Sequence, residues 1–153
     1  MRLLNFNICS NSYAHSISAF GNEWDLHNLA HFQELVYDFK RNLIILNWTI
    51  DYAISPWGAP KEFVNVNGLS IVFNKPNIIF ISPSNNHFKQ NENDCLLGIS
   101  KIVPMELNSF VAPKYRTKIE WSCEIYNLLF VFQSGLSFEI DAESAELKLK
   151  RQI

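Results

Sequence analysis

The stretch YNLLFVFQSGLSFEID, residues 126–141, is the part of the sequence that decides the fold class. Two apolar runs, 126–133 and 136–141, flank the dipeptide Ser134-Gly135. Glycine reaches the left-handed backbone conformation of a tight turn between antiparallel strands without a steric penalty. A glycine-containing pair between two strand-forming runs therefore predicts a β-hairpin here.

The second run of this hairpin alternates apolar and polar side chains. The apolar set is Leu136, Phe138 and Ile140, and the polar set is Ser137, Glu139 and Asp141. Successive side chains of a strand point to opposite faces of a sheet, so the alternation predicts one face on a core and one face in water. The first run is apolar on both faces and is predicted to lie in the middle of a sheet.

Two more hairpins are predicted upstream. Runs 35–39 and 43–50 are separated by KRN, where Asn42 suits the left-handed conformation of a short loop. Runs 69–73 and 78–82 are separated by NKPN, where Pro76 favours a turn. The remaining predicted strands are 2–8, 95–103 and 144–150.

Long helical periodicity is nearly absent, and one short helical segment is predicted near residues 25–31. Asp25 stands at its start, where a side-chain oxygen can accept hydrogen bonds from the first N–H groups. Short strands joined by polar turns indicate a mainly β protein, either an antiparallel β-sandwich or a partly open barrel. The length of 153 residues predicts a single domain over 1–153.

Composition narrows the function classes. Hydrophobic residues make up 48% and charged residues 18%, with a net charge of -2, so no basic face for nucleic acid is expected. The longest apolar run, residues 43–46, is too short to span a membrane.

Cys9, Cys95 and Cys123 form no C-x-x-C pair, and we expect free thiols in a reducing, cytoplasmic environment.

The stretch WDLHNLAHF, residues 24–32, holds His27 and His31 four positions apart. On a helix this spacing places both imidazoles on one face, as in the zinc motif H-E-x-x-H. Asn28 replaces the glutamate that serves as general base in that motif, and a third metal ligand is not evident. The surrounding apolar residues favour a capped turn against the core over a metal site.

Motifs for catalysis and cofactors are missing. The five glycines form neither a G-x-G-x-x-G nor a Walker loop, and no G-x-S-x-G elbow occurs. We therefore expect no catalytic residue, no cofactor and no metal.

Candidate partner-binding residues lie in two loops and on the last predicted strand. Trp57 follows a proline in the loop 51–60, where an aromatic side chain is either an interface anchor or a lid. Acidic residues are the second group: Glu92, Asp94, Glu139 and Asp141. They are interpreted either as a solubilising face or as a surface that meets lysine and arginine of a partner.

The order of these pieces resembles a known kind of protein. The segments LVYDFKRNLIILNW, VNGLSIVFNKPNIIFISP, NENDCLLGISKIVP and LLFVFQSGLSFEIDAESAEL carry the resemblance, which covers roughly residues 24–149. They are similar to small uncharacterised bacterial β-rich proteins of the kind found among immunity proteins of contact-dependent or polymorphic toxin systems. The resemblance implies a non-enzymatic protein that binds and neutralises a cognate toxin, and it assigns no fixed functional residues.

Three hypotheses follow. The first is a protein-binding module, of the immunity-protein kind, that blocks a toxin by steric occlusion. The second is a small-ligand or sugar-binding β module, suggested by the aromatic surplus of 12 Phe and 4 Trp. The third is a metal-dependent hydrolase that uses His27 and His31.

Overall fold

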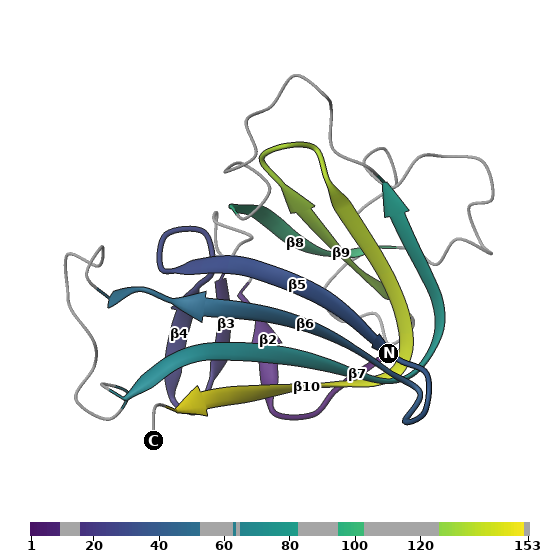
Figure 1. The fold of residues 1–153 in the computed structure, drawn as a ribbon, viewed down its shortest axis with the longest axis horizontal. Helices are drawn as coiled ribbons and strands as arrows, with labels where there is room; N and C mark the ends of the chain where they lie inside the picture. Colours follow the sequence, from purple (N-terminus) through teal and green to yellow (C-terminus); the bar gives the residue numbers. More distant parts are fainter. Residues whose placement is uncertain (10–15, 53–62, 64, 83–94, 103–125, 152–153) are drawn as a thin grey trace.

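The fold was analysed in a computed structural model that describes residues 1–9, 16–52, 63, 65–82, 95–102 and 126–151. These residues form strands and turns, and no helix occurs among them (Figure 1). The strands are β1 (Arg2–Leu3), β2 (Phe6–Ile8), β3 (Ser16–Ala19), β4 (Asn22–Asp25), β5 (Ala30–Asp38), β6 (Leu43–Ile50), β7 (Val66–Ser82), β8 (Leu96–Ile102), β9 (Asn127–Phe132) and β10 (Ser137–Arg151). The prediction of a mainly β protein is confirmed.

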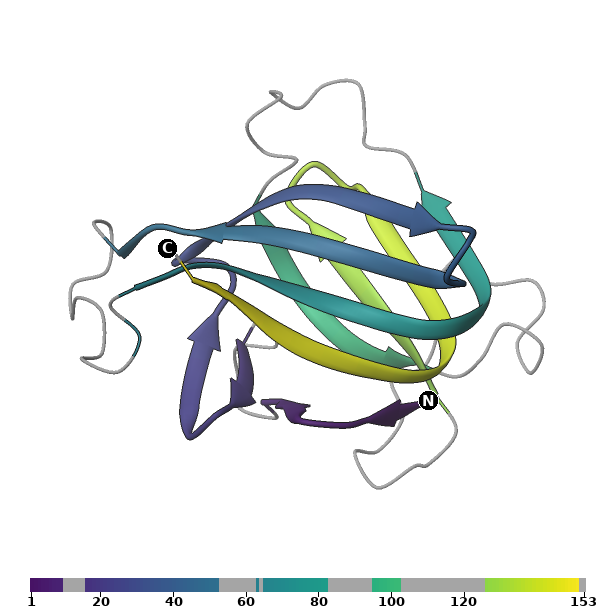
Figure 2. The ribbon, with the colours of Figure 1, turned by 60° about the horizontal axis from the view of Figure 1, so that its bottom comes forward.

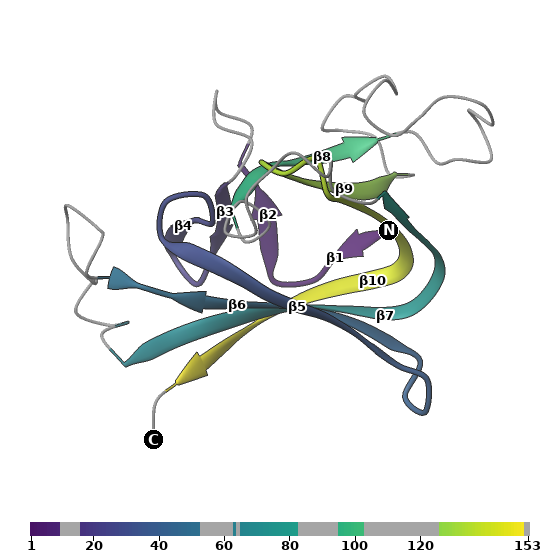
Figure 3. The ribbon, with the colours of Figure 1, turned by 45° about the horizontal axis from the view of Figure 1, so that its top comes forward.

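The larger sheet, sheet A, has seven strands. Its order is β5-β6-β7-β10-β9-β8, all antiparallel, and β1 adds a short parallel pairing with β10. The long strands β7 and β10 bend together, so that β8 and β9 lie over β5 and β6 (Figure 3). Sheet A is thus a curled half-barrel, which agrees with the predicted partly open barrel.

The bend replaces one of the predicted hairpins. Runs 69–73 and 78–82 are not two strands but the two halves of β7, which pairs with β10 along its whole length. The residues read as a turn form an irregularity instead: Lys75 has φ 48°, and the register shifts between Asp141 and Ala142 of β10. A bulge of this kind bends a strand without reversing it. The chain cannot turn back here because β10 runs beside both halves.

The other two predicted hairpins are confirmed. β5 and β6 form one, with Asn42 at φ 53°, and β9 and β10 form the other, with Gly135 at φ 84°. The predicted strand 144–150 is also real, but it continues from 136–141 as one strand of 15 residues.

Sheet B is small and has the order β2-β3-β4. The predicted strand 2–8 divides between the two sheets, because the chain leaves sheet A after Leu3 and enters sheet B at Phe6. Asn5 lies at the crossing. Its side chain accepts a hydrogen bond from Leu147 N at 2.8 Å and donates one to Leu147 O at 2.9 Å, so an amide group replaces a strand neighbour there.

The predicted helix near residues 25–31 is wrong. Asp25 does cap a turn, since its Oδ1 accepts from the N–H groups of His27 at 3.0 Å and Asn28 at 3.1 Å. The turn ends after one cycle, because Ala30 already pairs with Ile50 as the first residue of β5. Pairing with β6 therefore overrides the weak helical pattern.

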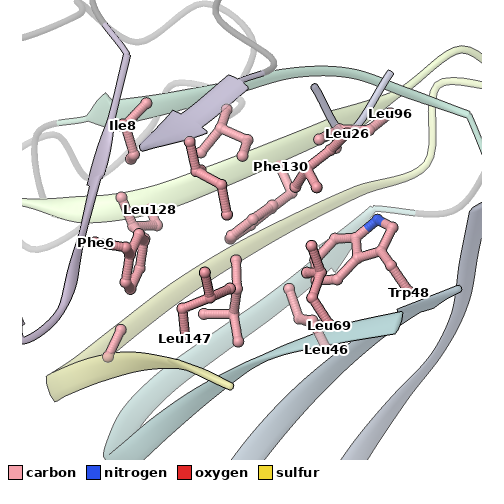
Figure 4. Packing of buried hydrophobic residues seen from close by; sticks show 14 of the residues in the cluster. Phe6, Ile8, Leu26, Leu46, Trp48, Leu69, Leu96, Leu128, Phe130 and Leu147 are labelled. Carbon is pink, nitrogen blue, oxygen red and sulfur yellow. The ribbon is translucent and has the colours of Figure 1, made fainter. Parts of the chain in front are cut away.

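The hydrophobic core lies inside the curl and is closed by sheet B. Phe6 from β2, Phe130 from β9 and Trp48 from β6 all point into this interior (Figure 4). Phe32 joins the two halves of sheet A: its ring lies 5.3 Å from Trp48 and 4.9 Å from Phe132. Trp48 is 1% exposed, as expected for a core residue.

Candidate functional site

Three of the predicted partner-binding residues lie outside the described residues. They are Trp57, Glu92 and Asp94. The same holds for Cys123, whereas Cys9 and Cys95 lie among the described residues.

The two acids of the last strand do not form the expected wet face. Glu139 is fully buried (0% exposed) and accepts a hydrogen bond from Asn127 Nδ2 at 2.8 Å. Asp141 is half-buried and accepts from Asn77 Nδ2 at 3.2 Å. The prediction of a solvent-exposed face fails for Glu139 because both faces of sheet A are buried around the β9–β10 hairpin, as the 1% exposure of Asn127 also shows.

The two histidines do not share a helix face. His27 lies in the turn after β4, where its Nδ1 is 2.8 Å from Leu96 O, and His31 lies on β5 with its side chain exposed. Among the residues that the structure describes, no three potential ligands are gathered in a metal-binding group.

His27 does come close to a thiol. Cys95 Sγ lies 3.4 Å from His27 Nδ1. A carbonyl oxygen can only accept a hydrogen bond, so the 2.8 Å contact with Leu96 O requires Nδ1 to carry the proton. That nitrogen therefore cannot take a proton from Cys95, and the pair is not arranged as a nucleophile with its base.

The most exposed aromatic side chain of the described residues sits at the β5–β6 hairpin. Phe39 is 81% exposed and Tyr37 is 38% exposed, and their ring centroids are 4.2 Å apart. Lys40 and Arg41 follow directly and are also exposed. We call Tyr37, Phe39, Lys40 and Arg41 the tip surface. The hairpin projects beyond the neighbouring strands (Figures 1 and 3).

Local hydrogen bonds hold the tip surface in place. Arg41 N donates to Asp38 Oδ1 at 3.0 Å, and Lys75 N of β7 donates to Asn42 O at 3.1 Å. Asn42 supplies the left-handed residue of the turn, a conformation that asparagine tolerates well. The aromatic pair is therefore presented on a fixed backbone, which lowers the entropy lost on binding.

The charge of the tip surface is positive. The segment also holds one acid, Asp38, whose Oδ2 lies 3.7 Å from Arg41 Nε. The neighbouring Lys75 forms its own ion pair with Glu143 at 2.8 Å, and this hydrogen bond lowers the pKa of the Glu143 carboxyl. One positive charge over residues 38–42 is thus left without an acidic partner in that segment.

A second feature lies on the outer face of sheet A, the face opposite the core. Here β5, β6, β7 and β10 run side by side (Figure 2). Residues of these strands line an open cavity of about 410 Å³ on this face. Most of the residues that line it are polar, and Glu34, Asn47 and Lys150 are among them. We call it the outer pocket.

Neither surface was foreseen in the sequence. The run 35–39 was interpreted only as a strand, although Phe39 follows the last residue of β5 and therefore belongs to the turn. The outer pocket depends on side chains brought together from residues 33 to 150, so no local pattern marks it.

Comparison with known proteins gives no match. The sequence matches no protein-family model, no curated protein and no solved structure.

Proposed function

We propose that this chain is a non-enzymatic protein-binding module that binds its partner through the tip surface. The observation that supports this proposal is the exposure of Phe39 (81%) beside Tyr37 and Arg41 on a rigid hairpin. An exposed ring contributes nothing to the core, and aromatic residues with arginine dominate the binding energy of protein interfaces. The resemblance to immunity proteins suggests a toxin as partner, neutralised by steric occlusion.

The chemistry of the tip surface suggests the shape of the partner site. Phe39 and Tyr37 require an apolar cleft, and Lys40 and Arg41 require carboxylates at its rim. An acidic partner surface is thus proposed, in place of the basic partner that the acids of the sequence first suggested.

A binding experiment with Phe39→Ala tests the proposal. Tagged wild-type protein and the variant are used to capture partners from the source cell, and the affinity for the captured partner is then measured by calorimetry. Loss of a central aromatic anchor costs about 2 kcal/mol or more, so the affinity should fall at least about 25-fold. Phe80→Ala, which changes another exposed phenylalanine (40%), should leave the affinity unchanged.

Stability must be measured in the same series. The Phe39 side chain is almost fully exposed, so Phe39→Ala should leave the free energy of unfolding within about 0.5 kcal/mol of wild type. Equal capture by both variants, or no discrete partner for wild type, contradicts the proposal. The toxin part is tested separately: co-expression of wild type, but not of Phe39→Ala, should restore the growth of cells that produce the captured partner.

A further inference from the structure

The outer pocket is built around the side chain of Asn47. This residue is 8% exposed, and its amide joins four strands. Asn47 Nδ2 donates to Glu34 Oε1 of β5 at 3.0 Å, while Asn47 Oδ1 accepts from Ser70 Oγ of β7 at 2.6 Å and from Lys150 Nζ of β10 at 2.9 Å. Lysine is only a donor, so the orientation of the amide is determined.

The register explains why these side chains meet. Glu34 pairs with Asn47, and Asn47 pairs with Ser70, so the three stand in one row across the outer face. A β-bulge between Phe32 and Glu34 inserts Gln33, whose Nε2 donates to Thr49 Oγ1 at 3.0 Å. Bulges commonly redirect side chains toward a site.

Gly68 provides the space of the outer pocket. It stands between Thr49 and Lys150 in the next row, where any other residue would place a side chain on the outer face. A Cβ at Gly68 would lie 2.7 Å from Trp48 O, so the position excludes even alanine without a backbone shift. At Gly68 the outer face therefore presents backbone and no side chain.

The polar groups alternate in chemical character and balance in charge. The Glu34 carboxylate accepts hydrogen bonds, and the Lys150 ammonium donates them with three protons. Asn47 lies between the two: its Nδ2 donates to Glu34 and its Oδ1 accepts from Lys150. The two formal charges cancel, so neither a strong anion nor a strong cation is favoured. The indole of Trp48 belongs to the core side, so the hydrogen-bonding groups of the pocket come from polar side chains and from backbone.

We infer that the outer pocket binds one neutral polyhydroxylated small molecule of the monosaccharide class. Neighbouring hydroxyls of such a ligand can donate to Glu34 and accept from Lys150, which matches the alternation of acceptor and donor. A volume of about 410 Å³ suits a single small ligand, near the lower end of the range of known sites. The inference does not depend on the tip surface.

The test uses ¹⁵N-labelled protein and four probes, D-glucose, D-galactose, D-mannose and myo-inositol, at millimolar concentration. Binding of at least one should shift the amide side-chain signals of Asn47 and Gln33 and the backbone signal of Gly68. Glu34→Gln and Lys150→Met should each weaken that binding about tenfold or more, because each removes a charge-assisted hydrogen bond. Phe39→Ala should bind the same probe as wild type.

Matched controls lie on the same face of β10. Glu146→Gln and Lys148→Met change a carboxylate and an ammonium that form their own 3.5 Å ion pair and do not line the pocket. They should bind as wild type does. The inference is overturned if no probe shifts these signals, if glycine or inorganic phosphate shifts them instead, or if binding survives in both Glu34→Gln and Lys150→Met.

Discussion

Phe20 holds the first position of the two-residue turn between β3 and β4. Its φ is 54° and that of Gly21 is 75°, which is the pattern of a type I′ turn. Left-handed backbone suits Gly21 but strains a bulky residue, and the Phe20 side chain is also 48% exposed. The backbone strain at Phe20 therefore lowers the stability of the folded protein. Because the ring is about half exposed, its packing does not offset that strain.

Replacement of Phe20 should make the protein more stable. Phe20→Asn creates an Asn-Gly pair, the preferred sequence of this turn, and should raise the free energy of unfolding by about 1 kcal/mol. Urea denaturation measures the change. Phe20→Ala is the control, because it removes the ring but keeps the strain. A gain for alanine as large as for asparagine would attribute the effect to ring exposure alone.

Single residues were predicted well where the chemistry is local. Asn42 was assigned its role as a left-handed turn residue, and Asp25 was assigned its role as a cap. Each of these roles depends on the residue and its nearest neighbours. Glu139 and Phe39 were not predicted correctly, since exposure depends on what the rest of the chain places over a side chain.

Strands β9 and β10 are tied together by a buried polar pair as well as by their backbones. The Glu139 carboxylate accepts from Asn127 Nδ2 at 2.8 Å, and both residues are buried. Buried polar groups cost most when one partner is removed and the other is left without a hydrogen bond. The pair therefore makes the β9–β10 hairpin sensitive to substitution at Glu139.

Two substitutions at Glu139 should separate shape from hydrogen bonding. Glu139→Ala should lower the free energy of unfolding by about 2–3 kcal/mol, because Asn127 loses an acceptor in the interior. Glu139→Gln keeps an acceptor oxygen and should lose less than about 1 kcal/mol. Chemical denaturation checks both, with Glu146→Ala on the more exposed part of β10 as control. Equal losses for alanine and glutamine would mean that the negative charge itself is required.

The predicted strands were placed more reliably than their lengths, although β3 and β4 were not predicted at all. Nearly every predicted strand was found, yet the turn signal at residues 74–77 marks a bend in β7, and the two predicted strands at the C-terminus are one. A turn signal states that the backbone departs from a regular strand. Whether the chain reverses its direction there depends on the neighbouring strand, here β10, which is distant in the sequence.

Tyr126 is buried in the core and Tyr52 is partly buried against it, and both tyrosines make the stability of the whole molecule depend on pH in the alkaline range. Burial raises the pKa of Tyr126 and of Tyr52 above the ordinary value of about 10. The folded state then binds these protons more tightly than the unfolded state. Their contribution to stability is complete below the unfolded pKa and is lost as pH rises through the folded pKa.

The free energy of unfolding should therefore fall above about pH 10. The double variant Tyr52→Phe and Tyr126→Phe should lose less stability than wild type between about pH 9 and pH 11, because the buried rings no longer ionise. Urea denaturation at each pH measures the difference. Tyr37→Phe changes an exposed tyrosine of the tip surface and should follow wild type. An unchanged alkaline slope in the double variant would contradict the assignment.

Alternation, turn residues and composition were enough to indicate a mainly β, antiparallel protein, because strand formation and tight turns depend on neighbours in sequence. The curl of sheet A, the division of residues 2–8 between two sheets and the burial of Glu139 arise from pairings between distant segments. The same is true of the two surfaces proposed for binding. The outer pocket depends on the register of four strands. The tip surface depends on the packing of the rest of the protein, which leaves Phe39 exposed.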